Sequence, residues 1–149
     1  MKIFVGADHR GFALKKTIIH FLQSQGHEAV DAGTHDSADC DYPKIAYDVA
    51  TRVVKHPGSL GILLCMTGLG HSIAANKVPG AYAALVYNKE AAMLSRRHNN
   101  ANILVLGSKF VDDTAMQDII KAWLAAEFEG GRHARRIEQI KSIEKEFLK

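Results

Sequence analysis

SLGILLCMTGLGHSIAANK, residues 59–77, is the stretch that decides the fold. Its apolar run is typical of a buried strand, the glycines after Cys65 indicate a tight turn, and the alanine-rich end predicts a helix. Cys65 therefore falls at the carboxyl end of a strand, where open α/β sheets bind their ligands. The turn and the helix start offer N–H groups to an anion, and Gly68 and Gly70 let backbone approach it closely. The stretch predicts a thiol beside an oxyanion or phosphate site.

The same order of strand, turn and helix recurs on both sides of this stretch. Segments with the apolar spacing of amphipathic helices follow the apolar runs. One predicted helix ends near Gly26, one begins at Tyr42 and Pro43, and others cover residues 89–97, 116–124 and 137–147. The predicted strands are residues 2–6, 28–31, 60–64, 81–86 and 103–106. Because parallel neighbours need crossover helices, the pattern predicts an α/β fold with a doubly wound, five-stranded, mainly parallel sheet and a C-terminal helix.

Composition limits the class of protein. The 149 residues, 47% of them hydrophobic, fit a single domain over residues 1–149. A net charge of +3 favours a small-anion site over a nucleic-acid surface. The two cysteines form no disulfide framework, and no secretory segment or run of about 20 apolar residues occurs. We expect a cytoplasmic protein with no membrane or nucleic-acid partner, and a secreted protein with two cysteines stays the alternative.

Polar residues gather where predicted strands end or begin. Asp8 and His9 follow the first strand and Cys65 the third, so these residues share one edge of a parallel sheet. His98 and Asn99 lie in a polar turn that enters the fifth strand, at the opposite edge. A partner subunit could supply His98 to the first edge, which indicates a dimer.

Cys65 has a functional and a structural interpretation. A thiol at a helix N-terminus has a lowered pKa and can serve as a base or nucleophile. The alternative is a small buried hydrophobe in a plain tight turn. The residues after Cys65 exclude a P-loop, which needs Gly-Lys-Ser/Thr, and a phosphatase loop, which needs arginine at the position of His71.

The other candidates also carry two interpretations each. Asp8 is either a helix cap or a site residue, and His98 is either a site residue or part of a solvated turn. Arg132 and Arg136 lie four residues apart and would share a helix face, as a phosphate clamp or as a plain basic helix end. The remaining histidines show no metal-ligand spacing, so we expect no metal.

Five separated motifs resemble one known family. They are GADHRGFALK (residues 6–15), DYP (41–43), CMTGLGHSIAANK (65–77), SRRHNNANILVLGS (95–108) and EGGRHARRI (129–137). Together they resemble the type B ribose-5-phosphate isomerases, a family shared with galactose-6-phosphate isomerase subunits. The resemblance implies a Rossmann-like α/β fold and a homodimer or homotetramer whose sites lie between subunits. It also implies interconversion of ribose 5-phosphate and ribulose 5-phosphate in the pentose phosphate pathway, with no metal or cofactor.

The resemblance also implies a role for each matching residue. Cys65 is the base that moves a proton between C2 and C1, and His98 with Asp8 assists opening of the sugar ring. The residues expected to stabilise the enediolate or line its loop are Thr67, Met66 and the backbone of Gly68, Leu69, Gly70 and Ser72. The residues expected to hold the phosphate and the sugar are His9, Arg132 and Arg136, and Tyr42 and Asn99.

Two residues depart from the family pattern. Met66 stands where glycine is usual, and His71 stands at a commonly apolar position, where it either adds a titratable group to the site or points into solvent. Either residue could favour another substrate, including allose or galactose 6-phosphate. A noncatalytic module that binds phosphosugars is the third hypothesis, favoured if Cys65 is buried and inert.

Overall fold

The computed structural model describes residues 1–147, in which strands and helices alternate along the chain. The strands are β1 (Lys2–Ala7), β2 (Glu28–Asp31), β3 (Leu60–Cys65), β4 (Ala83–Leu85) and β5 (Ile103–Gly107). The helices are η1, a 3-10 turn (His9–Gly11), α1 (Phe12–Ser24), α2 (Tyr42–Lys55), α3 (Leu69–Ala75), α4 (Lys89–Asn99), α5 (Asp113–Ala125) and α6 (Arg132–Phe147).

The five strands form one sheet in the order β2-β1-β3-β5-β4, and every pairing is parallel. Phe4 pairs with Gly61 and Gly61 with Ile103, so β3 lies at the centre. All six residues of β3 are buried, as its apolar run predicts. The predicted doubly wound α/β sheet and C-terminal helix are thus confirmed.

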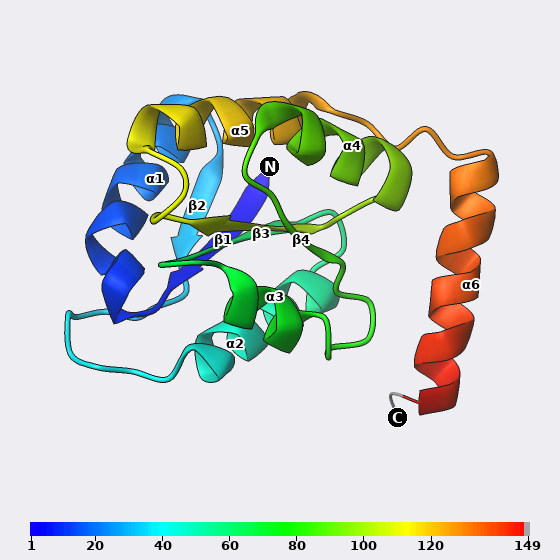
Figure 1. Ribbon diagram of the computed structural model, residues 1–149, viewed down its shortest axis with the longest axis horizontal. Coiled ribbons are helices and arrows are strands. Elements are labelled where there is room, and N and C mark those ends of the chain that lie inside the picture. Colours follow the sequence, from blue (N-terminus) through cyan, green and yellow to red (C-terminus); the bar gives the residue numbers. More distant parts are fainter. Residues whose placement is uncertain (148–149) are drawn as a thin grey trace.

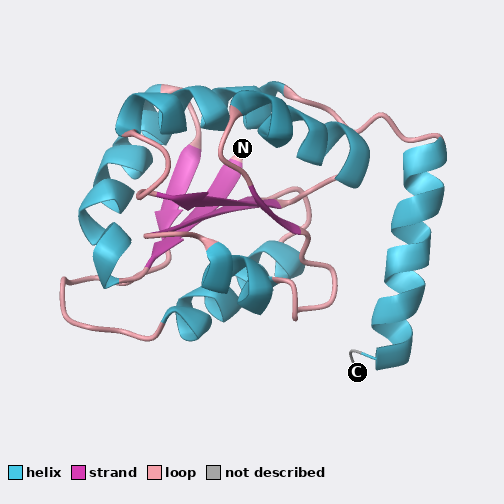
Figure 2. Ribbon diagram, in the orientation of Figure 1, coloured by secondary structure: helices cyan, strands magenta, loops and turns pink. Residues whose placement is uncertain are grey.

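Helices cover both faces of this sheet (Figure 1; Figure 2). α1, α4 and α5 pack on one face, in a core that includes Ile18, Ala92 and Trp123. α2 and α3 pack on the other face, through residues such as Val49 and Ala75. This arrangement leaves the two edges where strands begin and end open to ligands.

α6 stands apart from the sheet at the end of the chain (Figure 1). Ile137 of this helix is buried, and Glu144 accepts hydrogen bonds from the Gly80 N–H at 3.1 Å and the Tyr82 hydroxyl at 3.3 Å. Its other apolar residues include the exposed Ile143. Within residues 1–147, no helix combines the length and apolar character that crossing a membrane requires.

The predicted bounds of α4 and β4 differ from the structure for local reasons. α4 continues through His98 and Asn99 rather than ending at Arg97, and it stops at Asn100, whose left-handed backbone (φ 49°) is typical of a helix end. β4 covers fewer residues than the predicted 81–86. β4 begins at Ala83 rather than at residue 81, because the Tyr82 N–H donates to the Asn102 side chain at 2.8 Å instead of to the backbone of a neighbouring strand.

Candidate functional site

The turn after β3 folds back on the Cys65 thiol. The Gly68 N–H donates to Cys65 Sγ at 3.0 Å, and Gly68 has a left-handed backbone (φ 84°). A Cβ at Gly68 would lie 2.5 Å from the Leu85 side chain, so both conformation and space call for glycine. The predicted order of strand, thiol, glycine turn and helix is present.

The start of α3 leaves backbone donors free. The Leu69 N–H donates to Thr67 Oγ1 at 3.3 Å and the Ser72 N–H to the Gly68 carbonyl at 3.0 Å, so these amides are occupied. Within the described chain, the N–H groups of Gly70 and His71 have no hydrogen-bond partner. The predicted anion cradle from Gly68 to Ser72 thus narrows to these two amides, the usual free donors of a first helical turn.

Asp8 lies beside the Cys65 turn and also caps a helix. Its Oδ1 accepts the N–H groups of Arg10 and Gly11, both at 3.1 Å, which accounts for the 3-10 turn that follows β1. The carboxylate is buried, and its charge acts on both Cys65 and His71. Asp8 therefore caps the 3-10 turn and also lies beside the thiol, and its role as a site residue stays a prediction.

The predicted lowering of the Cys65 pKa is wrong. Burial raises the pKa of this thiol above its ordinary value and the charge of Asp8 raises it further, while hydrogen bonds from Gly68 and Thr67 oppose both effects. The position of Cys65 explains the difference, because the residue ends a buried strand and α3 begins four residues later. Its nearest charge is negative, so the thiolate is disfavoured.

Tyr42 and the two departures from the family pattern surround the same turn. The Tyr42 ring packs against Gly70 and meets the His71 ring edge-on, with 5.9 Å between centroids. His71 is completely buried, so it does not point into solvent. Met66 is partly exposed, and its sulfur accepts a hydrogen bond from Arg10 Nη1 at 3.0 Å. Met66 thus ties the thiol loop to the turn after β1.

His9 extends this edge toward the loop that precedes α2. Its Nδ1 accepts the Cys40 N–H at 3.3 Å, and its Nε2 lies 3.6 Å from Asp39. The structure therefore brings together Asp8, His9, Tyr42 and the residues from Cys65 to Ser72 at the carboxyl edge of the sheet. We define this set as the thiol half-site.

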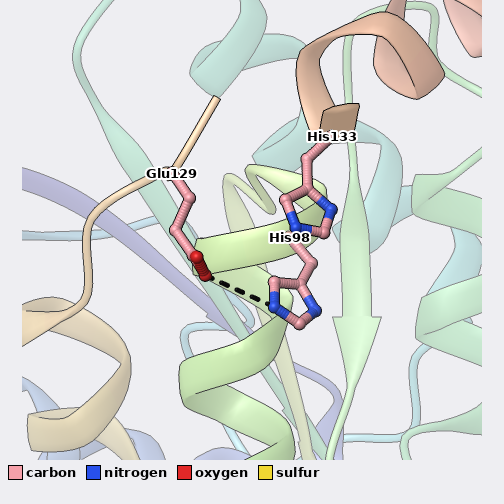
Figure 3. A group of neighbouring side chains, drawn as sticks. All are labelled: His98, Glu129 and His133. Carbon is pink, nitrogen blue, oxygen red and sulfur yellow. Dashed lines mark ion pairs between the residues drawn. The ribbon is translucent and has the colours of Figure 1, made fainter. Parts of the chain in front are cut away.

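A second group of polar side chains forms where α4 ends and α6 begins (Figure 3). His98 Nε2 lies 3.4 Å from Glu129 Oε1, and the His98 and His133 rings stack with centroids 4.2 Å apart and planes 8° apart. Arg97 joins α4 to the loop before α6, since its Nη2 lies 3.2 Å from the Glu129 carboxylate and its carbonyl accepts the Glu129 N–H. Sequence reasoning missed Glu129 and His133, although both lie within the motif that contains the two predicted arginines.

These side chains favour an anion over a metal ion. Within the described residues, His98, Glu129 and His133 are the one group whose ligand atoms lie close enough, within 4.8 Å of one another, to share a metal. Burial, and then the charges of His98, Arg132 and Arg136, lower the pKa of His133, while the Glu129 carboxylate opposes the shift. Stacked rings and arginines disfavour a dication. We define the cationic half-site as His98, Asn99, His133, Arg132 and Arg136.

The two half-sites lie at opposite edges of the sheet. α4 follows β4 and returns to the amino edge, so His98 lies a full strand length from Cys65. A six-residue strand spans roughly 20 Å. Asn99 lines a groove of about 450 Å³ that also includes Ile137 and Ile140 of α6. A single chain therefore does not bring the cationic half-site to the thiol.

A thiol, free amides and a cationic cluster on a doubly wound sheet are the arrangement of an α/β enzyme for a small anionic substrate. The model of the Ribose/Galactose Isomerase family matches residues 3–140, and the chain belongs to this family. It is 46% identical to ribose-5-phosphate isomerase B of Escherichia coli over 96% of both chains. It is also 49% identical to the Clostridium thermocellum ribose-5-phosphate isomerase B structure (TM-score 0.94, 99% of each chain covered). The Mycoplasma genitalium ribose-5-phosphate isomerase B structure, with bound ribulose-5-phosphate, is 47% identical (TM-score 0.93, 97% of each covered).

Proposed function

We propose that this protein is an aldose–ketose isomerase that interconverts ribose 5-phosphate and ribulose 5-phosphate, in the pentose phosphate pathway of the cytoplasm. The observation that carries the proposal is the Cys65 thiol, held at 3.0 Å by the Gly68 N–H beside the free amides of Gly70 and His71. Moving a proton next to a carbonyl needs a base and donors aimed at the developing oxyanion. The thiol half-site contains both.

In the proposed mechanism, the Cys65 thiolate takes the proton from C2 of the open-chain aldose and returns it at C1. The free amides, with the Thr67 hydroxyl, stabilise the enediolate oxygen. A donor of this kind typically contributes about 3 kcal/mol of transition-state stabilisation. Because the pKa of Cys65 is raised, the reactive thiolate is a minority species whose fraction grows with pH.

The rest of the proposed site binds the substrate and opens its ring. His98 and Asp8 assist opening of the furanose, and Tyr42 and Asn99 contact the sugar. His9, Arg132 and Arg136 hold the phosphate, as cationic side chains four residues apart on one helix can do. Fixing the phosphate also orients the reacting carbons, so the arginines contribute to kcat as well as to KM.

We propose that two copies of the chain complete each site, in a homodimer or homotetramer. The thiol half-site of one copy would face the cationic half-site of the other, since one chain holds them a strand length apart. Both regions expose apolar side chains suited to an interface, with Leu69 and Ile73 on α3 and Ile143 and Phe147 on α6 exposed by 54–73%. A two-fold interface would form two equal sites.

Mixing two inactive variants tests this proposal. Cys65→Ala and His98→Ala chains should each lose activity alone, and subunit exchange should restore it, because a heterodimer contains one site with neither defect. An equal mixture should reach about a quarter of the wild-type rate. Arg136→Ala should raise KM and lower kcat without unfolding the chain. Full activity in Cys65→Ala would refute the proposed base, and no recovery on mixing would refute the shared site.

A hexose 6-phosphate isomerase is the second candidate function. Met66 favours it, because a partly exposed side chain at the thiol loop alters the room for the sugar. Conversion rates with ribose 5-phosphate, allose 6-phosphate and galactose 6-phosphate decide between the substrates. Absence of conversion with all three, alongside binding of the phosphosugars, would instead indicate a noncatalytic module.

A further inference from the structure

His71 is a buried histidine without a hydrogen bond. The side chain is 0% exposed, and neither ring nitrogen has a partner within the described chain. Buried polar side chains almost always have a partner, and an exception calls for an explanation such as a catalytic role or a bound group. The position of His71 within the fold shows which explanation applies.

The surroundings of His71 belong to the thiol half-site. The ring lies in the first turn of α3, close enough to Asp8 for the carboxylate charge to act on it, and the same charge acts on Cys65. Tyr42 covers the imidazole with a ring edge, at an interplanar angle of 75°. Residue Tyr42 is 42% exposed, and within the described residues its hydroxyl makes no hydrogen bond, so the side chain can turn aside without losing one.

The imidazole is neutral in this place. Burial lowers the pKa of His71 to about 4, although the charge of Asp8 opposes the shift. A neutral imidazole has one N–H donor and one nitrogen acceptor, and both are unused here. A neutral imidazole of lowered pKa can donate its N–H to one substrate oxygen and take back a proton from the neighbouring one.

Isomerisation through an enediolate requires two proton transfers. Cys65 accounts for the transfer between carbons, while the transfer between the oxygens O2 and O1 has no assigned residue. We propose that His71 carries this second proton, in contact with the substrate oxygens once Tyr42 has moved. This inference rests on the isomerase function proposed above, and it adds a catalytic residue to that site.

The protons and electrons balance as follows. Cys65 removes the C2 proton, the C–H electron pair becomes the C1=C2 bond, and the carbonyl pair moves to O1, which takes the proton from His71. The same ring nitrogen then takes the proton of the O2 hydroxyl. As C2=O forms, the C1=C2 pair takes the proton of the Cys65 thiol at C1. Both side chains end in their starting states, and no co-reactant is needed.

The test compares His71→Gln with His27→Gln. His27 is a matched control because it also has a buried ring nitrogen without a partner, but it lies at the start of β2, away from the thiol. Ribose 5-phosphate conversion is measured in D₂O, together with deuterium that appears at C2 of the recovered aldose. We expect His71→Gln to lower kcat about 100-fold with KM nearly unchanged, while C2 exchange continues. His27→Gln should keep the wild-type kcat.

The outcomes separate this inference from the proposed function. A wild-type protein without isomerase activity would refute the function itself. If wild type is active and His71→Gln keeps kcat within about twofold, His71 carries no proton and the inference fails. Equal losses of conversion and C2 exchange would also overturn it. If His71→Gln does not fold, His71→Met fills the same buried space without a polar atom, and the same ratio of exchange to conversion decides.

Discussion

Replacing Gly107 by alanine should disable the thiol loop without touching any residue that carries chemistry. Gly107 ends β5, pairs with Cys65 of β3, and lies against the backbone of Thr67 in the turn that follows β3. A Cβ at this position would stand 2.6 Å from the Thr67 carbonyl carbon and 2.9 Å from its Cα. Backbone atoms, unlike the end of a flexible side chain, cannot swing away. The loop itself therefore has to move.

The size of the effect follows from these distances. Ordinary contact begins at 3.4 Å, and the Thr67 carbonyl oxygen would lie closer to the added Cβ than either of these carbons, so the Thr67 backbone has to shift by about 1 Å. A misplacement of about 1 Å can cost roughly 100-fold in rate, because base and donors no longer meet the reacting atoms. The added methyl should also lower the free energy of unfolding by about 1–3 kcal/mol. We therefore expect kcat to fall about 10- to 100-fold in a folded protein.

Gly61→Ala, on the neighbouring strand β3, is the matched control. A Cβ at Gly61 would meet the side chains of Val49 at 2.8 Å and Val53 at 3.0 Å, on the face covered by α2. This variant should lose stability to a similar extent and keep its kcat. The assay pairs conversion of ribose 5-phosphate with urea unfolding of both variants. Two results would refute the proposal that the position of the thiol loop controls kcat: a wild-type kcat in folded Gly107→Ala, or an equal loss of kcat in Gly61→Ala.

Other expected outcomes test the charges of the fold and the site. Because burial and Asp8 raise the pKa of Cys65, kcat/KM should rise between about pH 7 and about pH 9, and a flat profile would exclude the thiolate as base. Lys15→Met should lower the free energy of unfolding by about 1–3 kcal/mol, since buried Lys15 lies 2.7 Å from the partly exposed Asp31. Burial raises the pKa of Asp31, but hydrogen bonds from Lys15 and Gly33 outweigh burial and lower this pKa below its ordinary value of 3.8. The stabilisation by this pair is therefore present above pH 3.8 and is lost as the pH falls through the pKa of Asp31 in the folded protein. Acid unfolding followed by circular dichroism tests this, and equal acid sensitivity of wild type and Lys15→Met would contradict it. Glu144→Gln should lower the pKa of Tyr82, which burial and Glu144 raise to about 12, and an unchanged alkaline absorbance titration would contradict the position of α6.

Sequence patterns predicted the fold because each level of the chain points to the same answer. The apolar run of β3, the proline at the start of α2 and the apolar stripe of α5 are local signals, and the tertiary contacts of the folded chain agree with all three. The end of α4 escaped prediction, because His98 and Asn99 look like a turn until Asn100 takes the left-handed conformation. A single φ value decided that boundary, and periodicity does not report it.

The site was predicted in composition but not in electrostatics. Asp8 and Cys65 meet as expected, since both follow parallel strands whose carboxyl ends share one edge of the sheet, whereas the position of Tyr42 beside them followed from no strand pattern. The pKa of Cys65 depends on how deeply the end of β3 is buried and on which charge acts on the thiol, and residue spacing predicts neither. The stacking of His133 on His98 joins α6 to α4, and only the folded chain brings these two helices together.

The raised pKa of Cys65 also bears on why the site would need two copies. In one chain, burial and the Asp8 carboxylate act on the thiol, and both disfavour the thiolate that the proposed mechanism requires. The cationic half-site has the opposite character, with Arg132 and Arg136 exposed at the start of α6. Placed over the thiol by a second copy, these charges would favour the thiolate and bind the substrate phosphate together. Assembly would then supply both the missing residues and the missing positive charge, so a chain kept monomeric should lose base strength as well as affinity.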